Sequence, residues 1–161
     1  MIKRIEKWNI CFFWVVVFIL VIIIRLTISV LLQRLLHQSY NNPTVNEFDN
    51  SFIFYSLVFI IIPFVETLIF YFISFNALLF VKSKYHLNKS IIIFVFIAIS
   101  SFLFSLNHMY NIMYFISSLF GGMLYGFIYW LSFVKRKNPL LVVSVLHSAY
   151  NIVVFLIAQI K

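Results

Sequence analysis

Five long apolar segments constrain this chain more than any other feature of its sequence. A helix needs about 20 apolar residues to cross a hydrocarbon core of about 30 Å. With 64% hydrophobic and only 10% charged residues, the chain lacks the polar surface of a water-soluble globule. The sequence therefore predicts an all-α, polytopic transmembrane helix bundle of about five spanning helices, forming a single membrane domain over residues 1–161. The segments run over residues 10–32, 52–81, 91–107, 112–134 and 139–160.

The first segment, 10–32, predicts an additional N-terminal helix. It follows basic residues as a signal peptide would, but its apolar run is too long and lacks a small-residue cleavage site. Arg25 lies near its far end, where we expect the long side chain to reach the lipid headgroups. A specific partner inside the bundle is the less favoured alternative. The single cysteine, Cys11, cannot form an internal disulfide.

The second segment is longer than a membrane crossing requires, and Pro63 interrupts it. Proline lacks a backbone N–H and clashes with the preceding turn, so a kink is expected there. Glu66 follows three residues later. Irregular backbone at membrane depth is tolerated where it lines a cavity.

Positive charge is distributed in short clusters between the apolar runs. This distribution, with a formal net charge of +8, lacks the aromatic-interleaved basic patch of a nucleic-acid-binding protein, so no nucleic-acid partner is expected. Basic loops remain cytoplasmic, which predicts an amino terminus inside and a carboxyl terminus outside. The polar loop 37–51 is then external, and His37 and His86 are expected to be solvated. The nine clustered residues are Lys3, Arg4, Lys7, Lys82, Lys84, Lys89, Lys135, Arg136 and Lys137.

Four polar residues stand within or at the edge of the apolar segments. Glu66 is the one acidic residue in any of them, and an intramembrane ionisable group is a functional candidate by default. His147 and Asn151 are spaced i, i+4 and share one helix face, with Ser144 one turn earlier. His108 closes the third segment. Taken singly, Glu66 is explained equally well by a functional role and by a carboxyl that is protonated or hydrogen-bonds between helices. The His147 and Asn151 pair is better explained by hydrogen bonding between helices, and His108 by contact with lipid headgroups.

Together these residues are the parts of a hydrolytic site. A glutamate removes a proton from water. Histidines hold that water or protonate a leaving amine, and an asparagine amide stabilises an oxyanion. No HExxH, GxSxG or P-loop motif competes with this interpretation.

The residues lie in short motifs whose order resembles a known membrane family. The sequence reads Pro63-Phe-Val-Glu66-Thr67-Leu-Ile-Phe70-Tyr71, then Phe104-Ser-Leu-Asn-His108, then His147-Ser-Ala-Tyr-Asn151, with a glycine-rich stretch before the last. This is similar to the CPBP family, the CAAX protease and bacteriocin-processing membrane proteins also called Abi, whose pattern is EExxxR, FxxxH and HxxxN. The resemblance covers residues 52–160 and implies intramembrane peptide-bond hydrolysis.

By this resemblance Glu66 matches the general base, His108 the second-motif histidine, and His147 and Asn151 the third-motif pair. Phe104 opens the second motif and is expected to support the site. The resemblance implies no certain cofactor. If zinc is bound, Glu66, His108 and His147 are the candidate ligands.

Two positions depart from the pattern. Thr67 replaces the second glutamate and Tyr71 replaces the arginine, so an i, i+4 ion pair is lost at both ends. We expect the two side chains to share a hydrogen bond instead and to support the site from behind.

Two spacing arguments concern how the helices pack. At about 1.5 Å per residue from the basic loops, Glu66 and His108 lie at about 24 and 26 Å but His147 at about 14 Å. Tilt or a deeper helix start must bring them together. Gly121, Gly122 and Gly126 predict close helix packing.

Three functions follow in order of preference. The first is an intramembrane endopeptidase of a bacterial cytoplasmic membrane, surrounded by lipid and acting on a peptide or lipidated protein. The second is a non-catalytic bacteriocin-immunity or peptide-binding protein. A small transporter using Glu66 is less favoured because no inverted repeat is visible.

The orientation is testable by labelling. With Cys11 replaced, a cysteine introduced at Asn46 should react with a membrane-impermeant thiol reagent added outside the cell. Labelling that requires access from the cytoplasm would contradict the predicted orientation.

Overall fold

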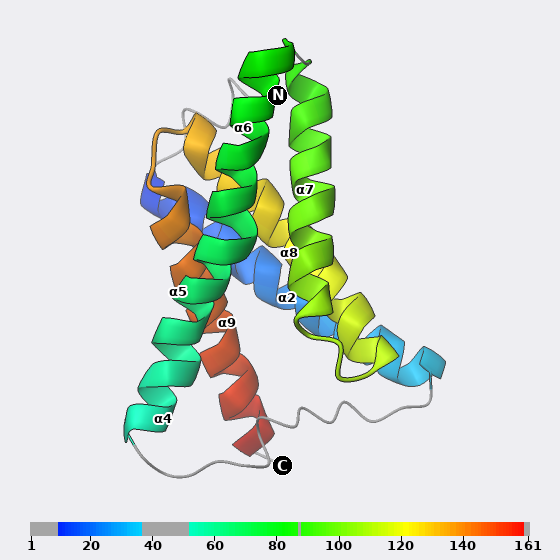
Figure 1. Ribbon diagram of the computed structural model, residues 1–161. Helices are drawn as coiled ribbons and strands as arrows, with labels where there is room; N and C mark the ends of the chain where they lie inside the picture. Colours follow the sequence, from blue (N-terminus) through cyan, green and yellow to red (C-terminus); the bar gives the residue numbers. More distant parts are fainter. Residues whose placement is uncertain (1–9, 37–51, 87, 160–161) are drawn as a thin grey trace.

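The computed structural model describes residues 10–36, 52–86 and 88–159, and every regular element within them is a helix. The loop 37–51 with His37, the basic residues before position 10, and Lys161 lie outside the described residues. Figure 1 shows the helices packed as a bundle, with α2 crossing it obliquely. They are α2 (Ile10–Leu36), a long helix formed by α4 (Phe52–Ser56), η1 (Leu57–Ile61), α5 (Ile62–Glu66), η2 (Thr67–Ile73) and α6 (Ser74–Tyr85), then α7 (Lys89–Leu106), α8 (Ile112–Val134) and α9 (Pro139–Gln159).

Five of these helices are long and apolar enough to cross a membrane, which confirms the predicted polytopic all-α bundle. Large apolar side chains such as Ile60, Phe80 and Phe94 are exposed on the outside of the bundle. In a bilayer this outer surface faces lipid, while the backbone groups are satisfied within each helix. The protein is therefore an integral membrane protein.

The long helix does not break at Pro63, but its hydrogen-bond pattern changes on both sides of it. Residues Leu57–Ile61 and Thr67–Ile73 are π-helical, and the Ile62 N–H donates to the Leu57 carbonyl five residues back. Because Pro63 has no N–H to donate, the regular α-helical pattern cannot run through this turn. Such wide turns are common at functional sites, and Glu66 lies directly between the two.

Helices α7 and α8 pack closely through small residues. A Cβ built on Gly122 would lie 2.9 Å from the Ser101 Cα, and one on Gly126 would lie 3.2 Å from the Ser100 Oγ. The predicted role of these glycines in close packing is therefore confirmed. Aromatic rings fill the adjacent core, including Tyr71, Phe75, Phe96, Phe104, Tyr125 and Tyr129.

The unequal depths counted along the sequence are reconciled by where the turns lie. Glu66 lies 20 residues before His86, and His108 lies 20 residues after Asn88, so both are equally far from the α6–α7 turn. The α8–α9 turn stands lower in the bundle than the α6–α7 turn (Figure 1). His147 thus starts from a deeper point and reaches the level of Glu66 in fewer residues.

The expectation that Arg25 extends to the headgroups is wrong. Arg25 is only 6% exposed, and its side chain points from α2 toward α8, where Gly121 leaves room for the guanidinium. The side chain finds a hydroxyl and aromatic faces inside the bundle, and these partners replace the water that snorkelling would provide.

Replacing Gly122 with alanine should destabilise the bundle. The added methyl group would meet backbone rather than a flexible side-chain end, and overpacking of this kind typically costs about 1–3 kcal/mol. A lower thermal melting temperature in detergent is expected for Gly122→Ala, with Met123→Ala, on the exposed side of α8, as the matched control. Equal melting temperatures for the two variants would contradict the packing argument.

Candidate functional site

The Glu66 carboxylate lies at the junction of three helices. Its residue is 9% exposed, and the two carboxylate oxygens face different histidines. Oε1 is 3.7 Å from Nε2 of His108, and Oε2 is 3.7 Å from Nε2 of His147. Three of the four predicted residues, from the long helix, the end of α7 and α9, are thus brought together.

Asn107 is a member of this cluster that sequence reasoning missed. Its side-chain amide donates a 2.9 Å hydrogen bond to Glu66 Oε1. The residue stands directly before His108 in the motif already identified, so the signal was present in the sequence. Helical spacing alone does not predict this contact, because neighbouring helical residues normally point in different directions. Here α7 ends at Leu106, and the following turn directs both side chains toward Glu66.

The environment of His108 determines which of its ring nitrogens carries the proton. Nδ1 lies 2.8 Å from the Phe104 carbonyl oxygen, which only accepts hydrogen bonds, so Nδ1 must be the donor. Burial lowers the pKa of His108 from its ordinary value, and the positive charge of Arg25 adds to this effect. The neutral ring that results presents a lone pair on Nε2 toward Glu66.

His147 is more deeply buried, at 3% exposure. The rings of Phe104 and Tyr125 flank it, with centroids 5.5 and 5.1 Å away. The Phe104 ring centroid also lies 4.4 Å from that of His108, so Phe104 packs against both imidazoles. Within the described part of the chain, His147 Nδ1 and the nearby Ser144 Oγ are buried without a hydrogen-bond partner.

Asn151 is the predicted residue that the structure leaves apart from the carboxylate. It lies one turn beyond His147 on α9 and is half-buried. Among the described residues it makes no hydrogen bond, so its amide is available to a bound molecule.

Thr67 and Tyr71 do not share the hydrogen bond expected between them. Thr67 donates to the Pro63 carbonyl at 2.7 Å, and the Tyr71 hydroxyl donates to the Gly122 carbonyl at 3.2 Å. Residues 67–73 are π-helical, so the i, i+4 neighbour relation of an α-helix does not apply to this pair. Tyr71 instead ties the long helix to α8.

The arrangement does not fit a metal centre. In the described ranges, no group of three or more His, Cys, Asp or Glu side chains is placed to hold a metal ion. Each histidine faces a different oxygen of Glu66, and Oε1 is already bonded to an amide hydrogen.

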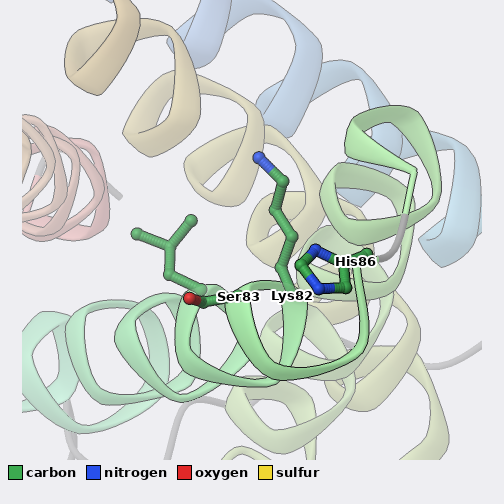
Figure 2. A pocket seen from close by; sticks show the side chains of 4 residues that line it. Lys82, Ser83 and His86 are labelled. Atoms are coloured by element: carbon green, nitrogen blue, oxygen red, sulfur yellow. The ribbon is translucent and has the colours of Figure 1, made fainter.

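A pocket of about 500 Å³ lies elsewhere, at the end of α6. Figure 2 shows its lining by Lys82, Ser83 and His86, with Leu79 as the fourth residue. His86 is exposed, as predicted for a solvated histidine. Because Lys82 stands 16 residues from Glu66 along one helix, about 24 Å at 1.5 Å per residue, this pocket is not part of the site.

Removing the Asn107 amide should weaken the site measurably. Hydrogen bonds to charged groups contribute about 1.5–3 kcal/mol, so Asn107→Ala should lower the melting temperature at neutral pH. Asn107→Asp should lower it further, because two carboxylates would then lie in hydrogen-bond contact. That extra loss should shrink at pH 5, where one carboxyl is protonated.

The control for this experiment is Asn76→Ala, since Asn76 is exposed and bonds only to its own helix. If the melting temperature of Asn107→Asp fell no further below that of Asn107→Ala at pH 8 than at pH 5, Asn107 would not contact Glu66.

Comparison with known proteins agrees with the motifs and the fold. The family model described as Type II CAAX prenyl endopeptidase Rce1-like matches residues 48–153. No curated protein and no solved structure matches. The matched segment contains Glu66, Asn107, His108, His147 and Asn151 and excludes α2. Since the match covers well over half of the chain, the protein belongs to the Type II CAAX prenyl endopeptidase Rce1-like family of membrane proteases.

Proposed function

We propose that this protein is an intramembrane endopeptidase that hydrolyses peptide bonds with a water activated by Glu66. The observation that carries the proposal is the pairing of both Glu66 oxygens with histidine Nε2 atoms, each 3.7 Å away. That separation is too long for a direct hydrogen bond. It is short enough for one water molecule to bond to both groups.

The tautomer of His108 supports a water between it and Glu66. Because Nδ1 is the donor to Phe104, Nε2 of the neutral ring is an acceptor. Two acceptors cannot bond to each other, but a water donates one hydrogen to each. Its oxygen lone pairs then remain directed away from both, toward a bound peptide.

The reaction follows from these positions. Glu66 takes a proton from the water as the oxygen attacks the carbonyl carbon of the scissile peptide bond, forming the new C–O bond. The carbonyl oxygen of the tetrahedral intermediate carries the negative charge. The proton then passes from Glu66, directly or through a histidine, to the leaving nitrogen as the C–N bond breaks. The products are a carboxylic acid and an amine.

The two asparagines have different roles in this mechanism. Asn107 holds Glu66 Oε1 and orients the carboxylate. Asn151, with an amide not engaged by any described residue, is positioned one turn from His147 to donate a hydrogen bond to the oxyanion. Preorganised donors of this kind typically contribute about 10²–10³ in rate.

The substrate we propose is a peptide or protein tail held at the membrane. The family description names prenylated CAAX sequences, which makes a lipidated C-terminal tail one candidate. With the orientation predicted from the basic loops, Asn107 and His108 lie at the outer end of α7. A peptide that reaches the outer leaflet is therefore the second candidate.

The test is cleavage by purified protein in detergent. Two quenched fluorescent probes separate the substrate classes: a farnesylated peptide ending in a CAAX sequence, and an unmodified amphipathic peptide. Glu66→Gln and His147→Ala should each lower kcat by about 10²-fold or more, as loss of a general base does. His86→Ala is the matched histidine control and should cleave like the wild type, because His86 lies in the distant pocket.

Equal cleavage by wild type and Glu66→Gln would refute the mechanism. Probe binding that survives Glu66→Gln, with no cleavage by any variant, would favour the alternative of a non-catalytic peptide-binding or immunity protein.

A further inference from the structure

Arg25 is an unusual residue for its position. It comes from α2, which lies outside the segment matched by the family model, yet its side chain is buried in the bundle. A Cβ on Gly121 would lie 2.7 Å from Arg25 Nε and 2.8 Å from its Cζ. Glycine at position 121 therefore creates the space that the guanidinium occupies.

The guanidinium is held by two tyrosines that border the candidate site. Nη1 donates a 3.2 Å hydrogen bond to the Tyr125 hydroxyl, and Cζ lies 3.8 Å from the centroid of the Tyr150 ring. Contacts of this kind are strongest for arginine when they are desolvated. Tyr125 in turn packs against the His147 ring, and Tyr150 directly precedes Asn151.

Charge links Arg25 to the site as well. Within the described ranges, the buried members of the Asp, Glu, Lys and Arg residues are Arg25 and Glu66. A chain of contacts joins the two residues: the guanidinium bonds to the Tyr125 hydroxyl, the Tyr125 ring packs against His147, and His147 Nε2 lies 3.7 Å from Glu66 Oε2. An opposite charge in the same interior stabilises a buried charge, so we expect the loss of Arg25 to change the stability of the buried Glu66 carboxylate.

We propose that Arg25 is a positioning residue of the peptidase site: it balances the charge of Glu66, holds Tyr125 against His147 and holds Tyr150 directly before Asn151. The N-terminal helix α2 is thereby part of the functional unit. Position 71, where the motif pattern has arginine, is Tyr71 in this chain, and its ring lies 6.4 Å from that of Tyr125. The guanidinium of Arg25 thus reaches the cluster of Tyr71 and Tyr125 from α2, and not from the long helix that carries position 71.

A thermodynamic cycle tests the coupling without any substrate. The melting temperatures of Arg25→Met, Glu66→Gln and the double variant are compared in one detergent. The melting temperature of the double variant should fall by less than the sum of the two single decreases. The reason is that the second substitution removes a charge that the first left unbalanced. Strictly additive losses would overturn the proposed charge balance.

Val21 provides the control cycle. It is buried on the same helix one turn before Arg25 and carries no charge. Val21→Ala combined with Glu66→Gln should therefore show additive losses. Coupling as large as that of Arg25 would mean that the effect reflects helix packing and not charge, which would also overturn the proposal.

A kinetic arm tests the positioning role and rests on the proposed peptidase function. With the farnesylated CAAX peptide or the amphipathic peptide as probe, Arg25→Met should lower kcat about tenfold or more with little change in KM. Arg25→Lys, which keeps the charge, should recover part of that loss. Val21→Ala should retain kcat.

The outcomes of the two arms are distinguishable. If the wild type cleaves neither probe, the proposed function fails while the stability cycle still decides whether Arg25 balances Glu66. If the wild type cleaves and Arg25→Met has the same kcat, or Arg25→Lys recovers nothing, the positioning role is refuted.

Discussion

The arrangement of the helices depends on one interaction, the stabilisation of the buried Glu66 carboxylate by polar groups around it. Glu66 lies in a bundle whose outer surface is apolar, where an isolated negative charge is expensive. Three kinds of neighbouring group stabilise this negative charge. An Asn107 amide bonds to one oxygen, two imidazoles stand 3.7 Å from the oxygens, and the Arg25 charge acts from α2. These groups come from three other parts of the chain: the turn after α7, which holds Asn107 and His108, and helices α9 and α2.

The features that depend on local pattern were predictable from the sequence. Apolar length gave the five spans, and proline chemistry marked the irregular turn before Glu66. Small-residue spacing predicted close helix packing, which the structure shows at Gly122 and Gly126 against α7. Motif order identified Glu66, His108 and His147 as one cluster, because an ionisable residue inside a membrane segment has few structural explanations.

The features that depend on a distant partner were not predictable in the same way. Arg25 was expected at the membrane surface because nothing near it in sequence signals the Tyr125 hydroxyl or the space at Gly121. Asn107 was passed over because its direction is set by the turn that ends α7. Thr67 and Tyr71 were paired by α-helical spacing, which the π-helical backbone there does not follow.

The two π-helical segments around Glu66 have a consequence for how the carboxylate is aimed. A π turn contains one residue more than an α turn. The position of this extra residue is set by which backbone groups form the i→i+5 hydrogen bonds. Moving it from one side of Glu66 to the other would rotate that residue about the helix axis by one position, about 100°. The carboxylate would then point away from His108 and His147 without any change in sequence. The direction of the Glu66 side chain is thus set by the hydrogen-bond pattern of the helix on either side of it.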